Sequence, residues 1–361
     1  MRHTKQALQA FGLLAALVLV PLASDAFELR FQTDANEDMA DVIRGSSLLA
    51  SAQQNDVKNT QDILATARAE YRQILATLYK QGYYSGTISI QVDGEEAATL
   101  PPFFTPKAIS EIIIKVQTGR PFKFGKIAIG PLAEATKLPD SFSRGGLARS
   151  TLIAEAVDSS ISGWRDAGHA KATTASQSVI ADHRRNRLDA SIALDPGPLV
   201  YFGSLNIQGA KNVKERRIRQ IAGLRKGAVF SPEALDRVAD RLRATGTFRS
   251  VALSEGEVVA PDGTMDITAR LVTEKPRRFG FGAEVSSLEG AAVSAYWMHR
   301  NIFGGAERLR FDGSIGGLGS TTSGIDYSIA ARFSRPGTTA PANTLNIDAE
   351  LAQLDEPEFQ S

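Results

Sequence analysis

The stretch GPLVYFGSLNIQG at positions 197–209 decides how the chain is organised, because looser copies of it occur twice more. GRPFKFGKIAIGP begins at position 119 and KPRRFGFGAEV at position 275, each with a proline shortly before an aromatic–glycine pair. These pairs are Phe124–Gly125, Phe202–Gly203 and Phe279–Gly280. They lie 78 and 77 residues apart, and a fixed period of this length indicates successive copies of one small structural unit.

The copy that begins at position 197 has two helical patterns behind its first strand. Apolar residues recur at helical spacing over 212–224 and again over 231–246. Ser231 is suited to cap the second helix and Gly246 to end it in the left-handed conformation. Two further strands are predicted at 247–255 and 264–274. The predicted order is β-α-α-β-β.

The copy that begins at position 119, and an earlier copy before it, repeat this plan with weaker signals. Their long helices are predicted at 62–82 and 150–169. Glycines that end the three long helices, Gly82, Gly168 and Gly246, keep step at 86 and 78 residues apart. Further strands are predicted at 83–92, 109–119 and 187–197. The chain therefore contains three copies of the unit.

Residues 1–26 have the pattern of a signal peptide. A basic start is followed by the apolar run FGLLAALVLV at 11–20, which is too short to span a bilayer. The small residues of SDA at 24–26 predict cleavage before Phe27. An uncleaved anchor is the alternative, and either reading predicts export across the inner membrane.

After Pro276 the helical patterns stop and strict alternation takes over. Phe279, Phe281, Ala283 and Val285 face one way, while glycine, glutamate and serine occupy the positions between them. The same alternation of apolar with polar or charged residues is found at 307–315, 324–334 and 345–351. It is typical of a membrane barrel with lipid outside and a wet lumen, and also of a soluble antiparallel sheet.

The repeats resemble a known family. Units of this order, with an aromatic–glycine strand start and a helix that ends at glycine followed by an aromatic residue, resemble POTRA domains. GPLVYFGSLNIQG, LDRVADRLRATGTFRSV and LYKQGYYSGTISI together resemble TamA, the outer-membrane family of the translocation and assembly module in the BamA/TamA superfamily. The resemblance implies an α+β fold of three POTRA domains at 27–118, 119–196 and 197–275. The first strands of a 16-stranded antiparallel outer-membrane β-barrel would follow at 276–361.

Residues 276–361 are too few for a complete barrel. They suffice for about five or six strands, whereas bacterial barrels begin at about eight. The final residues LDEPEFQS also lack the terminal aromatic strand expected of such proteins. We interpret the chain as a truncated barrel protein, with an all-β portion that is incomplete.

Free strand edges are the first candidate binding sites. The resemblance points to the strand after the second helix of each unit, at 84–92, 170–180 and 247–255, where an unpaired edge accepts a strand from an unfolded client. The alternative is that these are ordinary sheet edges. The candidate residues for client or partner binding are Tyr84, Ile88, Ile90, Phe248, Val251 and Leu253.

The first barrel strand is the second candidate site. In relatives a weak seam between the first and last barrel strands opens sideways and admits client strands, and Gly280 and Gly282 would weaken pairing on this side. Alternatively, the two glycines simply make room inside the lumen. The seam candidates are Phe279, Gly280, Phe281, Gly282 and Ala283.

The resemblance implies a function in the outer membrane of a Gram-negative bacterium, with the POTRA domains in the periplasm. The family assembles autotransporters and other outer-membrane proteins. Its partners would be a TamB-like protein anchored in the inner membrane, unfolded outer-membrane protein clients and outer-membrane lipid. The pair formed by TamA and TamB is also implicated in moving phospholipid between the membranes. The alternatives are BamA itself, a two-partner secretion pore, or a soluble periplasmic POTRA scaffold. Three repeats argue against the first two, which usually carry five and two.

Enzyme function has little support in the sequence. There are 41 Lys and Arg against 40 Asp and Glu, so no overall charge favours nucleic acid. The chain has no cysteine, its four histidines lack metal-ligand spacing, and no G-x-S-x-G motif is found. We expect no catalytic activity, no metal and no cofactor.

Two local features leave alternatives open. The basic stretch at 211–226 is suited to acidic lipid headgroups or an acidic partner, or is simply a solvated helix face. Tyr296 and Trp297 either belong to an interfacial aromatic girdle or pack in a core.

Overall fold

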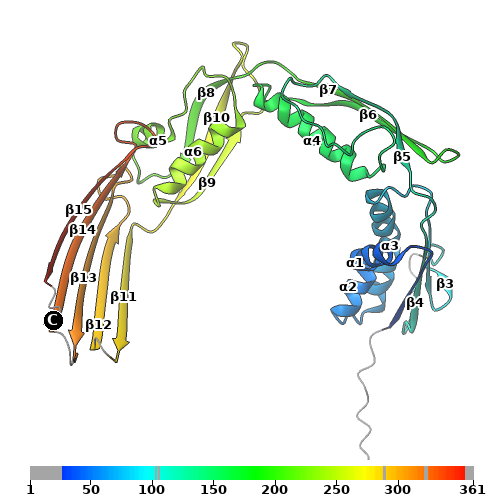
Figure 1. Cartoon of the computed structure of the whole chain (residues 1–361), viewed down its shortest axis with the longest axis horizontal. Coiled ribbons are helices and arrows are strands. Elements are labelled where there is room, and N and C mark those ends of the chain that lie inside the picture. Colours follow the sequence, from blue (N-terminus) through cyan, green and yellow to red (C-terminus); the bar gives the residue numbers. More distant parts are fainter. Residues whose placement is uncertain (1–26, 102–103, 105, 288–289, 321–323, 354–361) are drawn as a thin grey trace, which may run out of the picture. The chain divides into compact units, whose positions relative to one another are not determined.

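The computed structural model describes residues 27–101, 104, 106–287, 290–320 and 324–353. The predicted signal peptide at 1–26 and the last residues, 354–361, lie outside this part of the chain. The chain divides into two compact units. One comprises 27–127 with 140–154 and 179–190, and the other 128–139 with 155–178 and 191–353. Figure 1 labels most of the elements, which are numbered in chain order.

The first domain packs three helices on a mixed sheet. Its elements are β1 (Glu28–Thr33), α1 (Glu37–Ser46), α2 (Leu48–Gln54), α3 (Thr60–Lys80), β2 (Thr87–Val92), the short β3 (Glu95–Glu96) and β4 (Glu111–Gln117). The sheet order is β1-β4-β2-β3, with β1 parallel and β2 antiparallel to β4. The predicted long helix is confirmed: Asn59 caps it, and Gly82 follows its end with a φ of 86°.

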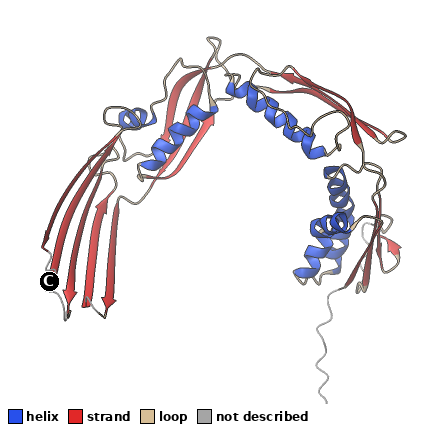
Figure 2. Cartoon of the chain, viewed as in Figure 1, coloured by secondary structure: helices blue, strands red, loops and turns tan. Residues whose placement is uncertain are grey.

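The third domain has the predicted order β-α-α-β-β. Its elements are β8 (Tyr201–Gly209), α5 (Glu215–Ala222), α6 (Pro232–Ala244), β9 (Phe248–Glu255) and β10 (Thr264–Thr273). Ser231 caps α6 by accepting a hydrogen bond from the Ala234 amide, and Gly246 follows with a φ of 65°. Phe202, Phe230 and Leu242 are among the core residues between the helices and the sheet. Figure 2 shows α6 lying along this sheet.

The second repeat departs from the predicted order. Its elements are β5 (Lys123–Gly130), α4 (Ser150–Asp166), β6 (Thr173–Asp182) and β7 (Arg187–Asp195). Residues 131–149 form turns and bends, so this described stretch lacks the first of the two expected helices. Pro131, Pro139, Gly145 and Gly146 interrupt the segment and leave no run long enough for a helix.

All three repeats nevertheless share one strand order. The orders are β1-β4-β2, β5-β7-β6 and β8-β10-β9, so the last long strand of each repeat lies in the middle of its sheet. This common topology agrees with the repetition seen in the sequence. It leaves β6 and β9 as edge strands, whereas β2 is followed by the short β3.

A five-stranded antiparallel sheet follows the third domain. Its strands are β11 (Arg277–Ser286), β12 (Gly290–His299), β13 (Arg308–Leu318), β14 (Asp326–Pro336) and β15 (Thr344–Gln353). They pair in chain order, which leaves β11 and β15 at the two edges of an open sheet in the described part of the chain. The predicted change from helices to alternating strands is confirmed. Separately, none of the described helices is long and apolar enough to cross a membrane.

Candidate functional site

The five-stranded sheet has two chemically different faces. Cross-strand pairing places predicted apolar positions of β11, β13, β14 and β15 in common rows with residues of β12 on one face. One row contains Phe281, Ala295, Gly313, Ile329 and Leu351. The next row contains Ala283, Val293, Ile315, Tyr327 and Gln353. The alternation in the sequence is therefore converted into a continuous apolar face.

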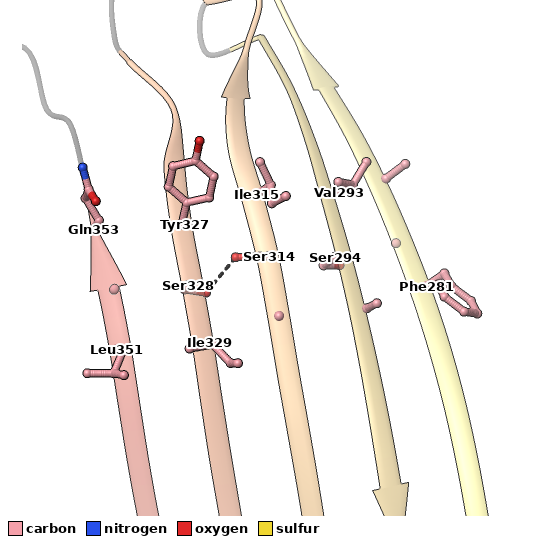
Figure 3. Close-up of a pocket in the computed structure, with 15 residues that line it drawn as sticks. Phe281, Val293, Ser294, Ser314, Ile315, Tyr327, Ser328, Ile329, Leu351 and Gln353 are labelled. Atoms are coloured by element: carbon pink, nitrogen blue, oxygen red, sulfur yellow. Dashed lines mark hydrogen bonds between the residues drawn. The ribbon is translucent and has the colours of Figure 1, made fainter.

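This apolar face is exposed. The side chains of Phe281 and Leu351 are 86% and 77% exposed, and Ile329 is also exposed. Figure 3 shows residues that line a hollow of about 1120 Å³ over this sheet, and they include Ser294, Ser314 and Ser328 of the opposite face. A soluble monomer rarely leaves a contiguous apolar surface of this kind uncovered, so the face indicates contact with another protein or with a membrane.

The opposite face carries paired charges and hydroxyl groups. The Asp312 carboxylate accepts hydrogen bonds from Arg310 Nε at 2.8 Å and from Arg332 Nη1 at 2.7 Å. The Arg310 guanidinium also lies 4.1 Å from the centre of the Tyr296 ring. Further along this face, Ser314 and Ser328 share a hydrogen bond of 2.7 Å, drawn as a dashed line in Figure 3. Paired charges and hydroxyl groups of this kind are suited to a surface in contact with water.

All five seam candidates lie on the edge strand β11. Their strand pairs with β12 without interruption from Arg277 to Ser286. A Cβ at Gly280 would overlap the Tyr296 ring, and one at Gly282 would lie 2.8 Å from Ser294 Oγ. The glycines thus make room for side chains of β12, which agrees with the alternative that the sequence left open. Phe279, Phe281 and Ala283 belong to the apolar face.

The predicted free edge of β2 is occupied at Ile90, which corrects the expectation for that residue. Ile90 is fully buried in the core of the first domain. Its amide donates to Glu96 Oε1 at 3.1 Å, and the Tyr71 hydroxyl also donates to Glu96. β3 pairs only with Gln91 and Val92 of β2, so Ile88 lies on a part of this edge that β3 leaves uncovered.

Tyr84 precedes β2 and has an aromatic environment. Its ring stacks on Tyr79 at 4.8 Å and meets Phe122 edge-on at 5.4 Å. Its hydroxyl is buried without a hydrogen-bond partner among the described residues. Burial raises the pKa of Tyr84 to about 12, with a smaller effect of Tyr79. The structure thus places Tyr84 against other aromatic rings rather than on the strand edge.

The edge strand β9 keeps an open side, but two of its candidates are core residues. Phe248 and Val251 are buried in the third domain, whereas Leu253 lines a groove of about 300 Å³ between α6 and β9. At one end of the groove, Glu255 forms an ion pair of 2.5 Å with Arg165. A client strand would therefore meet the backbone and Leu253. The sequence did not single out Ile180, an exposed apolar residue on the edge strand β6.

The third domain is joined to the sheet by contacts that the sequence did not indicate. The Lys214 amide donates to the Gly304 carbonyl at 2.7 Å, and Asn301 Nδ2 donates to the Asn212 carbonyl at 2.6 Å. Arg217, in the basic stretch, is only 4% exposed and donates to the carbonyls of Pro336 and Gly337. The solvated-face interpretation is therefore wrong for Arg217, although Arg216 and Arg219 are exposed.

The two aromatic residues of β12 lie on opposite faces. Trp297 is on the apolar face and stacks on Phe311 with ring centres 5.9 Å apart. Tyr296 is on the polar face, where its ring lies next to Gly280 and the Arg310 guanidinium. Only Trp297 has the position expected of an interfacial girdle. Among the described residues, no group of three or more His, Cys, Asp or Glu side chains is arranged to hold a metal ion.

Known proteins share parts of this architecture. Residues 200–272 match the POTRA family, described as a surface antigen variable number repeat. The chain is similar to the structure of BamA from Haemophilus ducreyi lacking POTRA domains 1–3, with a TM-score of 0.50 and 19% identity over 63% of this chain and 43% of that one. Comparison with curated proteins finds no significant match.

Weaker structural similarities were also found. BamA POTRA3–5 from Haemophilus influenzae has a TM-score of 0.45 and 13% identity, covering 68% of this chain and 95% of that one. CdiB from Acinetobacter baumannii has a TM-score of 0.38 and 13% identity, covering 63% and 44%. The third domain is thus a POTRA domain by its match, and the chain shares its fold with part of BamA while spanning less than half of that structure.

Proposed function

We propose that this chain belongs to an outer-membrane assembly protein of the BamA/TamA superfamily. Its POTRA-like domains would lie in the periplasm, and its five-stranded sheet would form part of a membrane β-barrel. The observation that carries the proposal is the exposed apolar face of the sheet, which lies opposite a face of paired charges and directly follows a POTRA domain. A barrel wall needs lipid on one side and water on the other.

Unfolded outer-membrane proteins are the proposed clients. Residues 248–255 of β9 and 173–182 of β6 lie at sheet edges, where backbone N–H and C=O groups point away from the sheet. Backbone pairing accepts many sequences, which suits a protein that handles different clients. In the third domain Leu253 and the groove beside α6 add a small apolar contact.

The edge strand β11 is the proposed exit for clients into the membrane. In a closed barrel, the last strand of the complete protein would pair with β11, because unpaired backbone groups are not tolerated in lipid. A barrel of 16 strands would need further strands beyond the five described. A client strand that displaced the last strand would pair with residues 279–283 and present its own apolar side to lipid.

We further propose a role of the TamA type. Three sheets with the same strand order support three POTRA domains, the number expected for that family. A TamB-like protein anchored in the inner membrane would then be the partner, autotransporters would be among the clients, and movement of phospholipid between the membranes would be a related activity. A soluble POTRA scaffold is the main competing hypothesis.

The experiment is a membrane partition assay in a Gram-negative host, with a matched pair of variants. Phe281→Lys with Ile329→Lys places two cations on the apolar face, and Ser294→Lys with Ser328→Lys places two on the polar face of neighbouring rows. A lysine facing lipid at mid-membrane costs about 2–4 kcal/mol. We expect the first variant to leave the outer-membrane fraction and the second to remain there, migrating faster before heating than after it.

Two results would contradict the membrane proposal. The wild-type chain, tested with its complete genomic reading frame, would be found soluble in the periplasm, or both variants would partition alike. The client proposal is tested separately with a photo-crosslinker at the exposed Ala252 on β9, compared with Gln208 on the opposite edge strand β8. We expect an unfolded barrel protein to crosslink at Ala252 only. Equal crosslinking at both edges would remove the assignment to β9.

A further inference from the structure

Cationic residues are concentrated at one end of the five-stranded sheet. The end that adjoins the third domain carries Lys275, Arg277, Arg278, Arg300, Arg308 and Arg335. At the other end, the stretches 282–294 and 313–329 contain no lysine or arginine, but they include Glu284 and Asp326. The strands are therefore charged asymmetrically along their length.

Two of these cations lie on the apolar face itself. Arg277 shares a cross-strand row with His299, Leu309, Phe333 and Ile347, and Arg335 is paired with Leu345 on the same side. Both are exposed. The contact of Arg335 with Glu307 is long, at 3.8 Å, and Arg277 forms no ion pair among the described residues.

The third domain extends the cationic surface. The Lys214 side chain lies against Gly304 in the turn between β12 and β13. In that turn the exposed Phe303 packs on Phe333 of the apolar face, with ring centres 6.3 Å apart. Lys211, Lys214 and Arg216 are exposed and have no ion pair in the described part of the chain.

The order of side chains along the apolar face matches a bilayer boundary. The middle of the face is largely aliphatic, with Ile329 and Leu351. The next row toward the third domain contains Phe279, Trp297 and Phe311. Arg277 and Arg335 follow at the end. Aromatic rings favour the interfacial level of a membrane, and cations beyond them meet the headgroup phosphates.

We propose that these cations bind the headgroups of anionic phospholipids in the leaflet next to the third domain. The cation belt is defined as Lys211, Lys214, Arg216, Arg277 and Arg335. This inference rests on the proposed membrane function and adds a lipid class and an orientation to it. Phospholipid is favoured over an acidic protein because Arg277 and Arg335 continue a lipid-facing surface and lie on an open face rather than in a pocket.

The test measures binding of the full chain, purified in detergent, to two kinds of vesicle. One contains phosphatidylcholine alone, and the other phosphatidylcholine with 30 mol% phosphatidylglycerol, in roughly 50 mM and 500 mM salt for screening of the headgroup charge. The belt variant is Lys214→Glu, Arg277→Glu and Arg335→Glu. The matched control reverses three exposed cations of the second domain, Lys137→Glu, Arg144→Glu and Arg184→Glu.

We expect the wild type to prefer anionic vesicles at low salt and to lose this preference at high salt. Each cation near an anionic surface contributes about fivefold in binding, so the belt variant should lose at least about tenfold of the preference. The control should stay within about twofold of the wild type, because charges on the second domain lie outside the belt.

Several outcomes would overturn the inference. The wild type would bind both vesicles equally, the belt variant would keep its preference, or the control would lose as much as the belt variant. Insertion into the neutral vesicles reports on the apolar face alone. A chain that inserts there without any anionic preference therefore refutes the cation belt and leaves the membrane function standing. A chain that inserts into neither vesicle refutes the membrane function.

Discussion

Strands β8 and β11 begin with the same aromatic–glycine pair and end in opposite environments. Phe202 on β8 is 2% exposed and packs against Phe230, with ring centres 5.6 Å apart. Phe279 on β11 is 62% exposed and is paired across the sheet with Trp297. The pair marks the start of a strand in both places. Whether its aromatic ring is buried depends on whether helices follow the strand to cover it.

The glycines of the two pairs differ as well. On β8, Gly203 makes room for Asp266, whose Oδ1 accepts the Ser204 amide at 2.7 Å. The second repeat has the same arrangement at Gly125, where Asp189 accepts the next amide at 2.6 Å. On β11, Gly280 makes room for the Tyr296 ring instead. The second and third repeats are thus related in detail, and the stretch at 275–285 shares only their beginning.

The largest difference in stability is expected between alanine substitutions of the aromatic residue on β8 and of the aromatic residue on β11. Phe202→Ala should destabilise the third domain by about 3–5 kcal/mol, because it leaves a cavity in a packed core. Phe279→Ala should change the unfolding free energy by less than about 0.5 kcal/mol in detergent, since its ring is mostly exposed. Thermal unfolding with site-resolved hydrogen exchange measures both. Equal losses would mean that Phe279 is also a core residue.

The joint between the third domain and the sheet gives the next comparison. Arg217→Met should cost about 2–3 kcal/mol, since the carbonyls of Pro336 and Gly337 would lose a charged donor in a buried place. Arg216→Met, next to it but exposed, should change stability by at most about 0.5 kcal/mol. Hydrogen exchange of the turn at 337–343 checks this. Similar behaviour of the two variants would show that Arg217 does not hold the joint.

A smaller effect is expected at the glycines. Gly203→Ala should cost about 1–2 kcal/mol by displacing Asp266 and leaving the Ser204 amide unpaired. Gly280→Ala displaces only an aromatic side chain, so Tyr296→Ala in the same chain should restore most of the loss. A double-mutant cycle measured by urea unfolding gives the coupling. Complete additivity at 280 and 296 would contradict the assignment of Gly280 as space for the ring.

The smallest expected effect is a pH dependence of stability that the first domain should show and the third should not. Glu70 in α3 is fully buried and accepts hydrogen bonds from the Leu48 and Leu49 amides, whereas the buried side chains of α6 are apolar. Burial raises the pKa of Glu70 above its ordinary value of 4.5. Its contribution is therefore fully present below pH 4.5 and is lost as the pH rises through the folded pKa.

The first domain should accordingly lose stability with increasing pH, by at most about 1.4 kcal/mol per pH unit for one carboxyl group. Urea unfolding of the wild type and Glu70→Gln at several pH values, followed by exchange of α3 amides, measures the difference between them. The difference should shrink toward low pH. A difference that does not vary with pH would exclude titration of Glu70 as the cause.

Local features of the fold were predictable from the sequence, because they depend on neighbours along the chain. The glycines at 82, 168 and 246 follow helix ends with positive φ, and the alternation after 276 correctly assigns both faces of the sheet. Strand β12 was less evident, since the small residues of GAAVSA give a weak alternation. The missing helix of the second repeat reflects the prolines and glycines at 131–149, which the repeat pattern concealed.

The candidate sites depended on contacts between distant residues, and these were not predictable. Nothing near Ile90 in the sequence indicates that Glu96 and Tyr71 cap its strand. The burial of Arg217 depends on carbonyls about 120 residues away. The edge positions of β9 and β11 were implied by the family resemblance, whereas the inward direction of Phe248 and Val251 required the packed domain.

The uneven distribution of cations along the strands also bears on how the sheet would enter a membrane. The sequences that connect β11 to β12 and β13 to β14 contain no lysine or arginine, so they would meet a lower barrier in crossing hydrocarbon. The opposite turns are attached to a folded domain and flanked by arginines, which makes their crossing far slower. Insertion of the proposed barrel would therefore proceed in one direction, with the kinetics of turn translocation setting the final topology.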